Sequence, residues 1–428
     1  MKKIGVLGAG SWGTALTWLL TNNGHEVTLW SIMEDEVEML RTKREHTSKL
    51  PGVKLQDSIQ LTSNLEEAMT DKDVLVLAVP SPFTRSTAQK MAPYLKKGQI
   101  IVNVAKGVEE HTLMTLSQII EEELPEANVA VSLANLGVDS TFFTVLPNTD
   151  LGKSTINYLK ANDVHTKHII KADGRMGLYY LEEGVAVRAS QVIYDRGNSA
   201  FAEYDYSDVD FEDILKDYDW LHLSGITPAL SYNCRRMIDK AVKVAKKLGL
   251  TVSFDPNFRS TLWSFGTARD VLSKYLPYVD VLIGIEPIHV YNEDGTDVKD
   301  GLTMDPSFKD MDRVFKAIDK QYHMKAIART VRYVHSGSNN SLKAFFYTNG
   351  ETYESKTINF DIVDRVGGGD AFSSGLIYAL MENMDPEDVV NFAVASSVMK
   401  HSIRGDTNIT SVAQIKSLMN NASFDVQR

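Results

Sequence analysis

The residues with the clearest chemical potential form one run near the end of the chain. Three glycines, Gly367, Gly368 and Gly369, come directly before Asp370, which opens an apolar helical segment. Glycines leave backbone N–H groups uncovered, and at a helix N-terminus these groups attract anions and can stabilise charge on a phosphoryl group in transfer. Asp370 is then placed to accept the proton of an attacking hydroxyl. The alternative interpretation makes Asp370 a helix N-cap after a flexible turn.

A second glycine pattern lies at the other end of the chain. Gly8-Ala9-Gly10-Ser11-Trp12-Gly13 falls between a predicted strand (residues 3–8) and a predicted helix (residues 13–23). Glycines at this spacing permit the tight turn, the approach of a pyrophosphate and close helix–strand packing. The alternative is an ordinary tight turn. The second strand ends in Trp30-Ser31-Ile32-Met33, which offers neither an acid for a ribose nor a base for a 2′-phosphate, so NAD and NADP both stay open.

The N-terminal part resembles the NAD(P)-dependent glycerol-3-phosphate dehydrogenases over residues 1–131. The likeness rests on Gly-Ala-Gly-Ser-Trp-Gly-Thr-Ala-Leu from Gly8, Leu-Pro-Gly-Val from Leu50, Val-Pro-Ser from Val79 and Ala-Lys-Gly-Val from Ala105. It implies that Ser11 and Trp12 contact the cofactor and that Lys106 reaches the cofactor and the substrate phosphate. On its own, Lys106 would be a surface lysine in a loop. The helical domain that carries the family's catalytic lysine does not follow, so half of a hydride-transfer site is missing.

The C-terminal part resembles the ribokinase family of sugar kinases. Asp364-Arg-Val-Gly-Gly-Gly-Asp-Ala-Phe-Ser-Ser-Gly375 is similar to the signature in which the family's catalytic base is the aspartate at position 370 here. Phe254-Asp-Pro-Asn-Phe-Arg259 and Leu223-Ser-Gly-Ile-Thr-Pro-Ala-Leu230 also match. The resemblance is greatest to 2-keto-3-deoxygluconate kinases. It implies a substrate site that contains Tyr179, Tyr194, Arg196, Asn257 and Arg259, and a nucleotide side that contains Thr330 and Arg332.

The elements that must position these residues alternate between strand and helix. Strands are predicted at residues 27–30, 73–79 and 99–104, and again at 220–224, 251–255, 279–283 and 325–327. Helices are predicted at 84–95 and 112–124, and a β-hairpin with a loop is predicted over residues 179–204. The alternation predicts an α/β fold with parallel, doubly wound sheets. We expect a Rossmann-type NAD(P)-binding fragment at 1–131 and a ribokinase-like domain without its first strands at 132–428.

The junction between the parts has no linker. Leu124-Pro125-Glu126-Ala127-Asn128-Val129-Ala130-Val131 runs directly into Ser132-Leu133-Ala134, and both families can be followed through Ala-Asn-Val-Ala-Val. By its resemblance to the sugar kinases, the chain has another sequence in place of that family's first strand, part of its lid and a glycine pair. The junction resembles a recombination or assembly event more than an evolved bifunctional enzyme. A sheet without an internal strand exposes unpaired backbone groups.

Composition limits the remaining interpretations. The 428 residues carry a net charge of −11, which argues against nucleic acid and anionic membranes as partners. The single cysteine, Cys234, excludes an internal disulfide and fits a reducing compartment. No apolar stretch approaches the roughly 20 residues of a membrane helix, so we expect a cytoplasmic protein. A homo-oligomer stays open. No metal ligands are assigned, because Mg²⁺ should arrive bridging the phosphates of ATP.

Three functions compete on these observations. The first is an ATP-dependent kinase for 2-keto-3-deoxygluconate or a related sugar acid, because two arginines suit a carboxylate. The alternative is a glycerol-3-phosphate dehydrogenase, carried by residues 1–131 alone. The third is an inactive chimeric chain that binds nucleotides. ATP-dependent turnover of a sugar acid identifies the first, and oxidation of NAD(P)H by dihydroxyacetone phosphate identifies the second.

Overall fold

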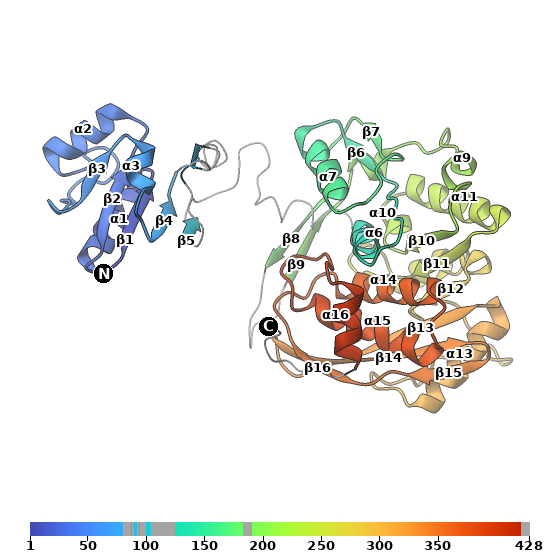
Figure 1. Ribbon diagram of the computed structural model, residues 1–428. Helices are drawn as coiled ribbons and strands as arrows, with labels where there is room; N and C mark the ends of the chain where they lie inside the picture. Colours follow the sequence, from blue (N-terminus) through green and yellow to red (C-terminus); the bar gives the residue numbers. More distant parts are fainter. Residues whose placement is uncertain are drawn as a thin grey trace. The chain divides into compact units, whose positions relative to one another are not determined.

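The computed structural model describes residues 1–79, 87, 90–91, 94, 100–103, 125–182 and 191–420 (Figure 1). The chain divides into two compact units, Met1–Leu116 and Ser117–Arg428. Within the described residues, no helix is both long and apolar enough to cross a bilayer. Lys106 and most of the helices predicted at 84–95 and 112–124 fall outside these residues.

The first unit contains a parallel five-stranded sheet in the order β3-β2-β1-β4-β5. Strand order reverses on either side of β1, which confirms the doubly wound Rossmann-type topology. The loop after β1 therefore lies at the switch point, where α/β sheets bind ligands. The elements are β1 (Lys3–Leu7), α1 (Ser11–Asn22), β2 (Glu26–Trp30), α2 (Glu34–Lys43), β3 (Gln60–Thr62), α3 (Leu65–Met69), β4 (Val74–Leu77) and β5 (Ile100–Asn103).

The second unit is built on a larger mixed sheet in the order β10-β11-β12-β13-β14-β15, with β16 also paired to β14. The first three pairings are parallel, and β14 is antiparallel to each of its neighbours. The strand predicted at 325–327 continues to Val334, because an antiparallel ladder to β14 extends it. The strands are β10 (Trp220–Ser224), β11 (Thr251–Asp255), β12 (Val281–Ile283), β13 (Ala326–Val334), β14 (Asn339–Thr348), β15 (Glu351–Glu354) and β16 (Ile358–Asp361).

Helices cover both faces of this sheet, so a separate hydrophobic core lies on each face. Successive side chains of β14 point to opposite faces and therefore into different cores. Phe345 belongs to the cluster that includes Ile238 and Val314, on α11 and α13. Phe346 belongs to the cluster that includes Leu376 and Val390, on α14 and α15. The helices of the second unit are α6 (Pro125–Asn135), α7 (Asp150–Ala161), α8 (Ala200–Glu203), α9 (Phe211–Leu215), α10 (Thr227–Leu230), α11 (Tyr232–Leu248), α12 (Phe265–Leu272), α13 (Phe308–Tyr322), α14 (Gly368–Met381), α15 (Pro386–Lys400) and α16 (Val412–Met419).

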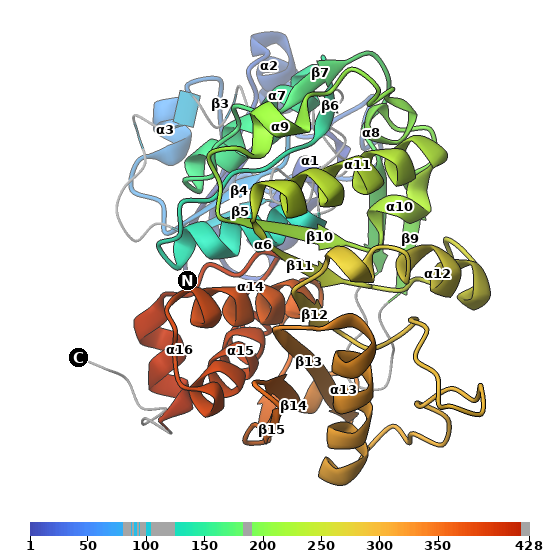
Figure 2. The ribbon, with the colours of Figure 1, turned by 90° about the vertical axis from the view of Figure 1, so that its right-hand side faces the viewer.

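Two small sheets accompany the large one. β6 (Val145–Pro147) pairs in parallel with β7 (Ile170–Ala172), and β8 (Leu178–Glu182) pairs with β9 (Gln191–Asp195) as an antiparallel hairpin. The hairpin lies where residues 179–204 predicted one. In Figures 1 and 2 the β6–β7 pair lies beyond the β10 edge of the large sheet, at the opposite end from β15.

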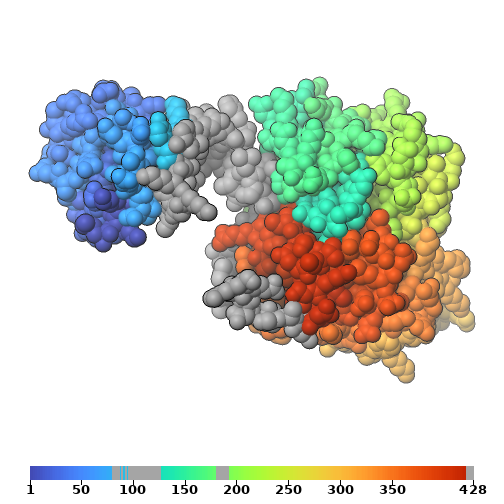
Figure 3. Space-filling model, in the orientation of Figure 1, coloured from blue at the N-terminus to red at the C-terminus, as the bar shows by residue number. Residues whose placement is uncertain are grey.

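The helix at the junction, α6, packs against α14, which lies near the C-terminal end of the chain. Val129 and Leu133 of α6 share a buried cluster with Ile377 of α14. The hydroxyl of Ser374 donates to Ser132 Oγ at 2.6 Å in the buried contact between the helices. Figure 3 shows the teal surface of this N-terminal region of the second unit directly beside the orange-red surface of its C-terminal region. Residues from the junction therefore help to support the glycine-rich end of α14.

Candidate functional site

The glycine run forms the first turn of α14, at the carboxyl ends of the parallel strands. The helix begins at Gly368 rather than at Asp370, and its N-cap is Gly367, in the left-handed conformation with φ 80°. Asp370 is consequently the third residue of the helix, and the N-cap interpretation of Asp370 is wrong. The first-turn N–H groups have no partner within the helix and point out of its N-terminus, which is the geometry that attracts an anion.

Packing explains two of the three glycines. A Cβ on Gly367 would lie 1.6 Å from the carbonyl oxygen of Asp406, and one on Gly368 would lie 2.3 Å from the ring of the fully buried His401. A Cβ on Gly369 would have no neighbour within 4 Å. The turn is therefore pressed against the 401–406 segment on one side and is open beside Gly369 on the other. The open side leaves room for a ligand.

Asp370 is a half-buried carboxylate with an altered acidity. Burial raises its pKa to about 6, although the amide of Asn128 and the positive charges of Arg259, Arg196 and Lys400 act in the opposite direction. Nδ2 of Asn128, on α6, donates to Oδ2 of Asp370 at 3.1 Å. A carboxylate with a pKa near neutrality is suited to act as a general base.

A second carboxylate, Asp255, faces the same site from the end of β11. Its Oδ1 accepts the backbone N–H of Asn257 at 2.9 Å. Burial, followed by the charge of Asp370, raises its pKa to about 7, while Arg259 lowers it. Asn257 itself has φ 39°, so the chain turns sharply between the carboxylate and Arg259. The two acids and the arginine therefore form one electrostatically coupled group.

The β8–β9 hairpin brings aromatic rings and an arginine to the site. The rings of Tyr179 and Tyr194 lie 6.1 Å apart, and the guanidinium carbon of Arg196 lies 5.8 and 4.7 Å from their respective centroids. The hydroxyl of the buried Tyr179 donates to Oδ2 of Asp406 at 3.3 Å. The three substrate residues predicted on this hairpin are thus brought together, and Tyr179 links them to the segment behind Gly367.

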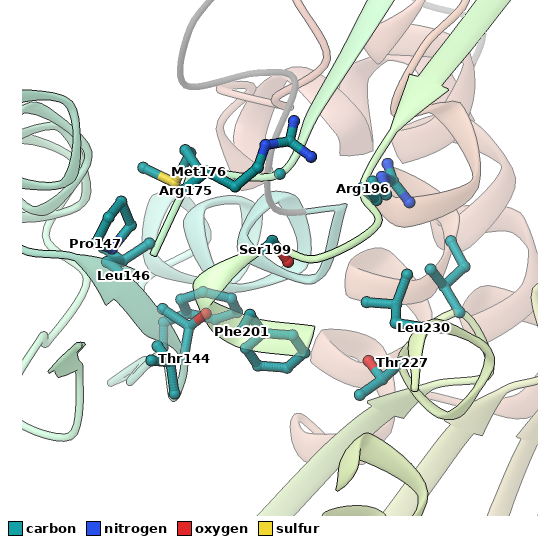
Figure 4. A pocket seen from close by; sticks show the side chains of 14 residues that line it. Thr144, Leu146, Pro147, Arg175, Met176, Arg196, Ser199, Phe201, Thr227 and Leu230 are labelled. Atoms are coloured by element: carbon teal, nitrogen blue, oxygen red, sulfur yellow. The ribbon is translucent and has the colours of Figure 1, made fainter. Parts of the chain in front are cut away.

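A small cavity of about 60 Å³ lies beside Arg196, and Figure 4 shows the side chains that line it. Thr227 and Leu230 of α10 line it from one side, and Leu146 and Pro147 of β6 line it from the other. Arg175 also lines this cavity, but its guanidinium donates to the carbonyl oxygen of Gly197 at 2.6 Å. Arg175 is therefore engaged in holding the turn that presents Arg196.

The two residues predicted on the nucleotide side, Thr330 and Arg332, have different surroundings in the structure. Arg332 is half-buried, and its pKa is lowered by burial and by the nearby charge of Arg365. Its charge also acts on His401, whose ring packs against Gly368. Arg332 thus lies within electrostatic range of the glycine turn. Thr330 is exposed on β13 opposite Ala344, and among the residues that the structure describes no contact connects it with the turn.

Three further residues support the turn and were not assigned from sequence. Lys400 is completely buried, and its ammonium donates to the carbonyl oxygen of Asp364 at 3.4 Å. The Asp364 carboxylate accepts the N–H groups of Val366 at 3.1 Å and Gly405 at 2.9 Å. Asn128 is the third. The sequence offered two signals: Asp364 stands at the start of the glycine run, and Asn128 lies in the Ala-Asn-Val-Ala segment. The roles of both residues depend on packing between distant segments, which the sequence alone does not show.

The glycine loop of the first unit has the conformation that its spacing predicts. Gly8 has φ 119°, and a Cβ there would lie 2.7 Å from the carbonyl oxygen of Ala78. A Cβ on Gly13 would lie 1.8 Å from the carbonyl oxygen of Gly8, so the helix packs tightly on the turn. Gly10 is the N-cap of α1 and has open space around it. Ser11 and Trp12, in the first turn, are exposed towards solvent. A pyrophosphate fits at this open N-terminus.

Comparisons with known proteins divide the chain in the same two parts. A model of the NAD-dependent glycerol-3-phosphate dehydrogenase N-terminus matches residues 3–136, and a model of the pfkB family of carbohydrate kinases matches residues 125–411. The two matches overlap at residues 125–136. This overlap contains α6, which lies in the second compact unit. The domain boundary expected between residues 131 and 132 stays a prediction.

Individual relatives follow the same division. An NAD(P)+ glycerol-3-phosphate dehydrogenase of Agathobacter rectalis is 63% identical over 131 residues, which are 31% of this chain and 39% of that protein. A 2-dehydro-3-deoxygalactonokinase of Haloferax volcanii is 28% identical over 71% of this chain and 89% of its own. The crystal structure of 2-dehydro-3-deoxygluconokinase from Thermotoga maritima matches with a TM-score of 0.65 and 36% identity, over 69% of this chain and 89% of its own. The chain thus spans well under half of the dehydrogenase relative and most of each kinase.

Proposed function

Because the chain belongs to the pfkB family of carbohydrate kinases, we propose that it transfers the terminal phosphoryl group of ATP to a hydroxyl of 2-keto-3-deoxygluconate or a closely related sugar acid. The observation that carries the proposal is the position of Asp370, in the first turn of α14 and within electrostatic range of two arginines. A base, an anion site and cations for an acidic substrate meet there.

Each group has a separate role in the proposed transfer. Asp370 accepts the proton of the attacking hydroxyl, and the N–H groups that follow Gly367 bind the phosphoryl oxygens. Mg²⁺ that arrived with ATP would neutralise charge on the phosphates. Arg332 adds positive charge on the nucleotide side. The oxygen of the sugar hydroxyl bonds to phosphorus as the bond to the leaving ADP breaks, and the proton goes to Asp370.

The acidic substrate is favoured by the cations around the sugar side. Arg196 and Arg259 both act electrostatically on Asp370, and a neutral sugar offers such a pair no counter-charge. An arginine fork binds a carboxylate with two parallel hydrogen bonds. Tyr194, whose ring lies against Arg196, keeps that guanidinium in place and presents a phenol to the ligand.

The direct test measures ADP release by the full chain with Mg²⁺ and ATP. We expect turnover with 2-keto-3-deoxygluconate or 2-keto-3-deoxygalactonate and little with ribose or fructose, which lack the carboxylate. Turnover confined to neutral sugars would reject the proposed substrate class. A folded protein that phosphorylates no sugar or sugar acid would favour the inactive chimera.

Arg259→Ala should separate substrate binding from chemistry. The substitution removes a forked contact to the carboxylate, so we expect a clear rise in the KM for the sugar acid and a smaller change in kcat. Steady-state kinetics with the sugar acid as the varied substrate measure this split. Arg269→Ala is a suitable control, because Arg269 pairs with Asp297 at 2.9 Å and is not among the charges that shift the pKa of Asp255 or Asp370. A fall in kcat with unchanged KM would contradict the assignment.

We also propose that the first unit binds a nicotinamide dinucleotide. The open N-terminus of α1 beside Gly10 supports this proposal. Gly10→Val should weaken the binding of NADH or NADPH strongly, because the side chain enters the space that the pyrophosphate needs. The unfolding temperature should change little, since a Cβ at this position has no neighbour within 4 Å. Nicotinamide fluorescence titration measures the effect, and unchanged affinity would place the site elsewhere.

A further inference from the structure

Among the described residues, the large sheet of the second unit ends at β10, and the outer backbone edge of this strand pairs with no other strand. Within the described residues β10 pairs with β11 alone. The carbonyl oxygen of Asp219 accepts from Thr251 N at 2.9 Å, and Gly225 N donates to Asp255 O at 2.7 Å. Since the backbone groups of alternate residues point to the same side, the odd-numbered residues face β11. The groups that face away belong to Trp220, His222 and Ser224.

A second edge faces this one from the segment that leads into β6. Phe142 N donates to the carbonyl oxygen of His165 at 3.0 Å, and Ile170 N donates to Thr144 O at 2.9 Å. The even-numbered residues of this segment therefore face the stretch from His165 to β7. By the same alternation, Thr141, Phe143 and Val145 direct their backbone groups away from β7.

A cavity of about 630 Å³ runs along both edges. Four consecutive residues of β10, from Trp220 to Leu223, line it, as do the consecutive residues from Val138 to Phe143. Side chains of consecutive residues in an extended segment point to opposite faces. A cavity that all of them line must therefore extend along the backbone edge rather than over one face. We call it the strand groove.

The walls of the strand groove are apolar on both sides. Val129 and Leu133 of α6 and Ile377 of α14 line one wall, and Leu215 of α9 and Ile238 of α11 line another. Charged residues lie near the start of β10, including Asp217 and Asp219. A ligand that fills the groove must thus be apolar above and below and must hydrogen-bond along both edges.

We propose that the strand groove binds an extended polypeptide segment of about five residues with apolar side chains, supplied by another molecule. A backbone is the one ligand class that offers donors and acceptors at the strand repeat of about 3.3 Å to two edges at once. Side chains that alternate above and below it would fill the two apolar walls, as in strands that are buried on both faces. This inference is independent of the proposed kinase activity.

The groove is connected with the candidate site through α6. Val129 lines the groove, and the preceding residue, Asn128, donates to Asp370. An inserted strand would pack on α6 and restrict the helix that holds Asn128. The bound segment would therefore support the position of the carboxylate as well as complete the sheet.

Hydrogen exchange on the full chain tests the proposal without ATP or sugar, so its outcome does not depend on the proposed function. The probe is a synthetic peptide of five alternating valines and isoleucines, the length of β10, between pairs of lysines. At a concentration of about 100 times its Kd, exchange of the Trp220 and His222 amides should slow by about 100-fold. The amides of Leu221 and Leu223, which face β11, serve as the internal reference.

The matched control is the same peptide with N-methyl groups on alternate residues, which keeps the apolar side chains but removes the donors of one edge. It should give no comparable protection. Equal protection by both peptides would mean apolar filling and would overturn strand pairing. Absence of protection with either peptide would overturn the site. Protection without peptide that rises with protein concentration would identify a second copy as the occupant and reject a foreign segment.

A pair of variants gives a second measurement. Ala130 lines the groove, whereas Ala134, one turn further along α6, does not. Ala130→Phe should fill the groove and abolish peptide binding, and Ala134→Phe should retain it. Both variants are compared by circular dichroism before titration. Peptide binding that survives in a folded Ala130→Phe variant would overturn the location.

Discussion

Asp370→Asn should lower the phosphorylation rate by roughly 10²–10⁴-fold, the usual worth of general-base assistance. Asparagine has nearly the same size, and its amide oxygen can still accept the Asn128 hydrogen bond, but it cannot take the proton of the sugar hydroxyl. ATP affinity should change little. Single-turnover measurement of phosphorylated sugar acid is the appropriate assay, because it isolates the chemical step.

The pH dependence gives this prediction a second readout. Asp370 acts as a base only when ionised, and burial raises its pKa to about 6. The kcat/KM of the parent should therefore fall as the pH decreases through about 6, whereas the residual rate of Asp370→Asn should lack this limb. Because Asp255, with a pKa of about 7, titrates in the same group, the parental profile should extend over more than one step.

The Asp370→Asn substitution should not lower the stability of the fold, although it lowers the rate. A carboxyl whose folded pKa lies above its unfolded value stabilises the fold at low pH, and this contribution is lost as the pH rises through the folded value. At pH 8 the parent bears the cost of an ionised, half-buried Asp370, and the amide variant does not. The melting temperature of Asp370→Asn should equal or exceed that of the parent. Near-parental turnover in a folded variant would show that Asp370 is not the base.

The sequence was most informative where one short segment contains the whole signal. The loop from Gly8 to Gly13 could be predicted because strand, turn and helix are contiguous, and the alternation of elements led to the correct α/β class. The glycine run before Asp370 likewise predicted, from one short segment, a turn that leads into a helix. In each case the turn and the helix that follows it lie in one contiguous segment, although the turns also pack against distant residues, Gly8 against Ala78 and Gly367 against Asp406.

Support from distant segments could not be predicted in this way. Asn128 reaches Asp370 across 242 positions, and Lys400 contacts Asp364 from the end of α15. Thr330 and Arg332 are two residues apart on one strand, but the guanidinium alone has the reach to act on the glycine turn. The junction at residues 124–134 indicated exposed backbone groups, but the groove between two facing edges required the fold.

Gly367→Ala should reduce both stability and catalysis, because alanine is unfavourable at this position for two reasons. Its φ of 80° costs an L-residue about 1–2 kcal/mol. A Cβ would also lie 1.6 Å from the carbonyl oxygen of Asp406, so the turn or the 401–406 segment must move. Either movement misplaces the N–H groups of the first turn of α14. Loss of one such donor lowers kcat by roughly 10²–10³-fold, and we expect an effect of that size with a lower melting temperature.

Gly369→Ala is the matched control in the same turn. A Cβ at this helical position has no neighbour within 4 Å, and alanine favours the helix over glycine. The melting temperature should therefore be kept or raised, while the methyl group enters the open side of the turn and raises the KM for ATP. Calorimetry and steady-state kinetics on both variants separate the two effects. If Gly367→Ala melts and turns over like the parent, the turn at Gly367 does not determine the anion site, and the phosphoryl group must be held by the arginines instead.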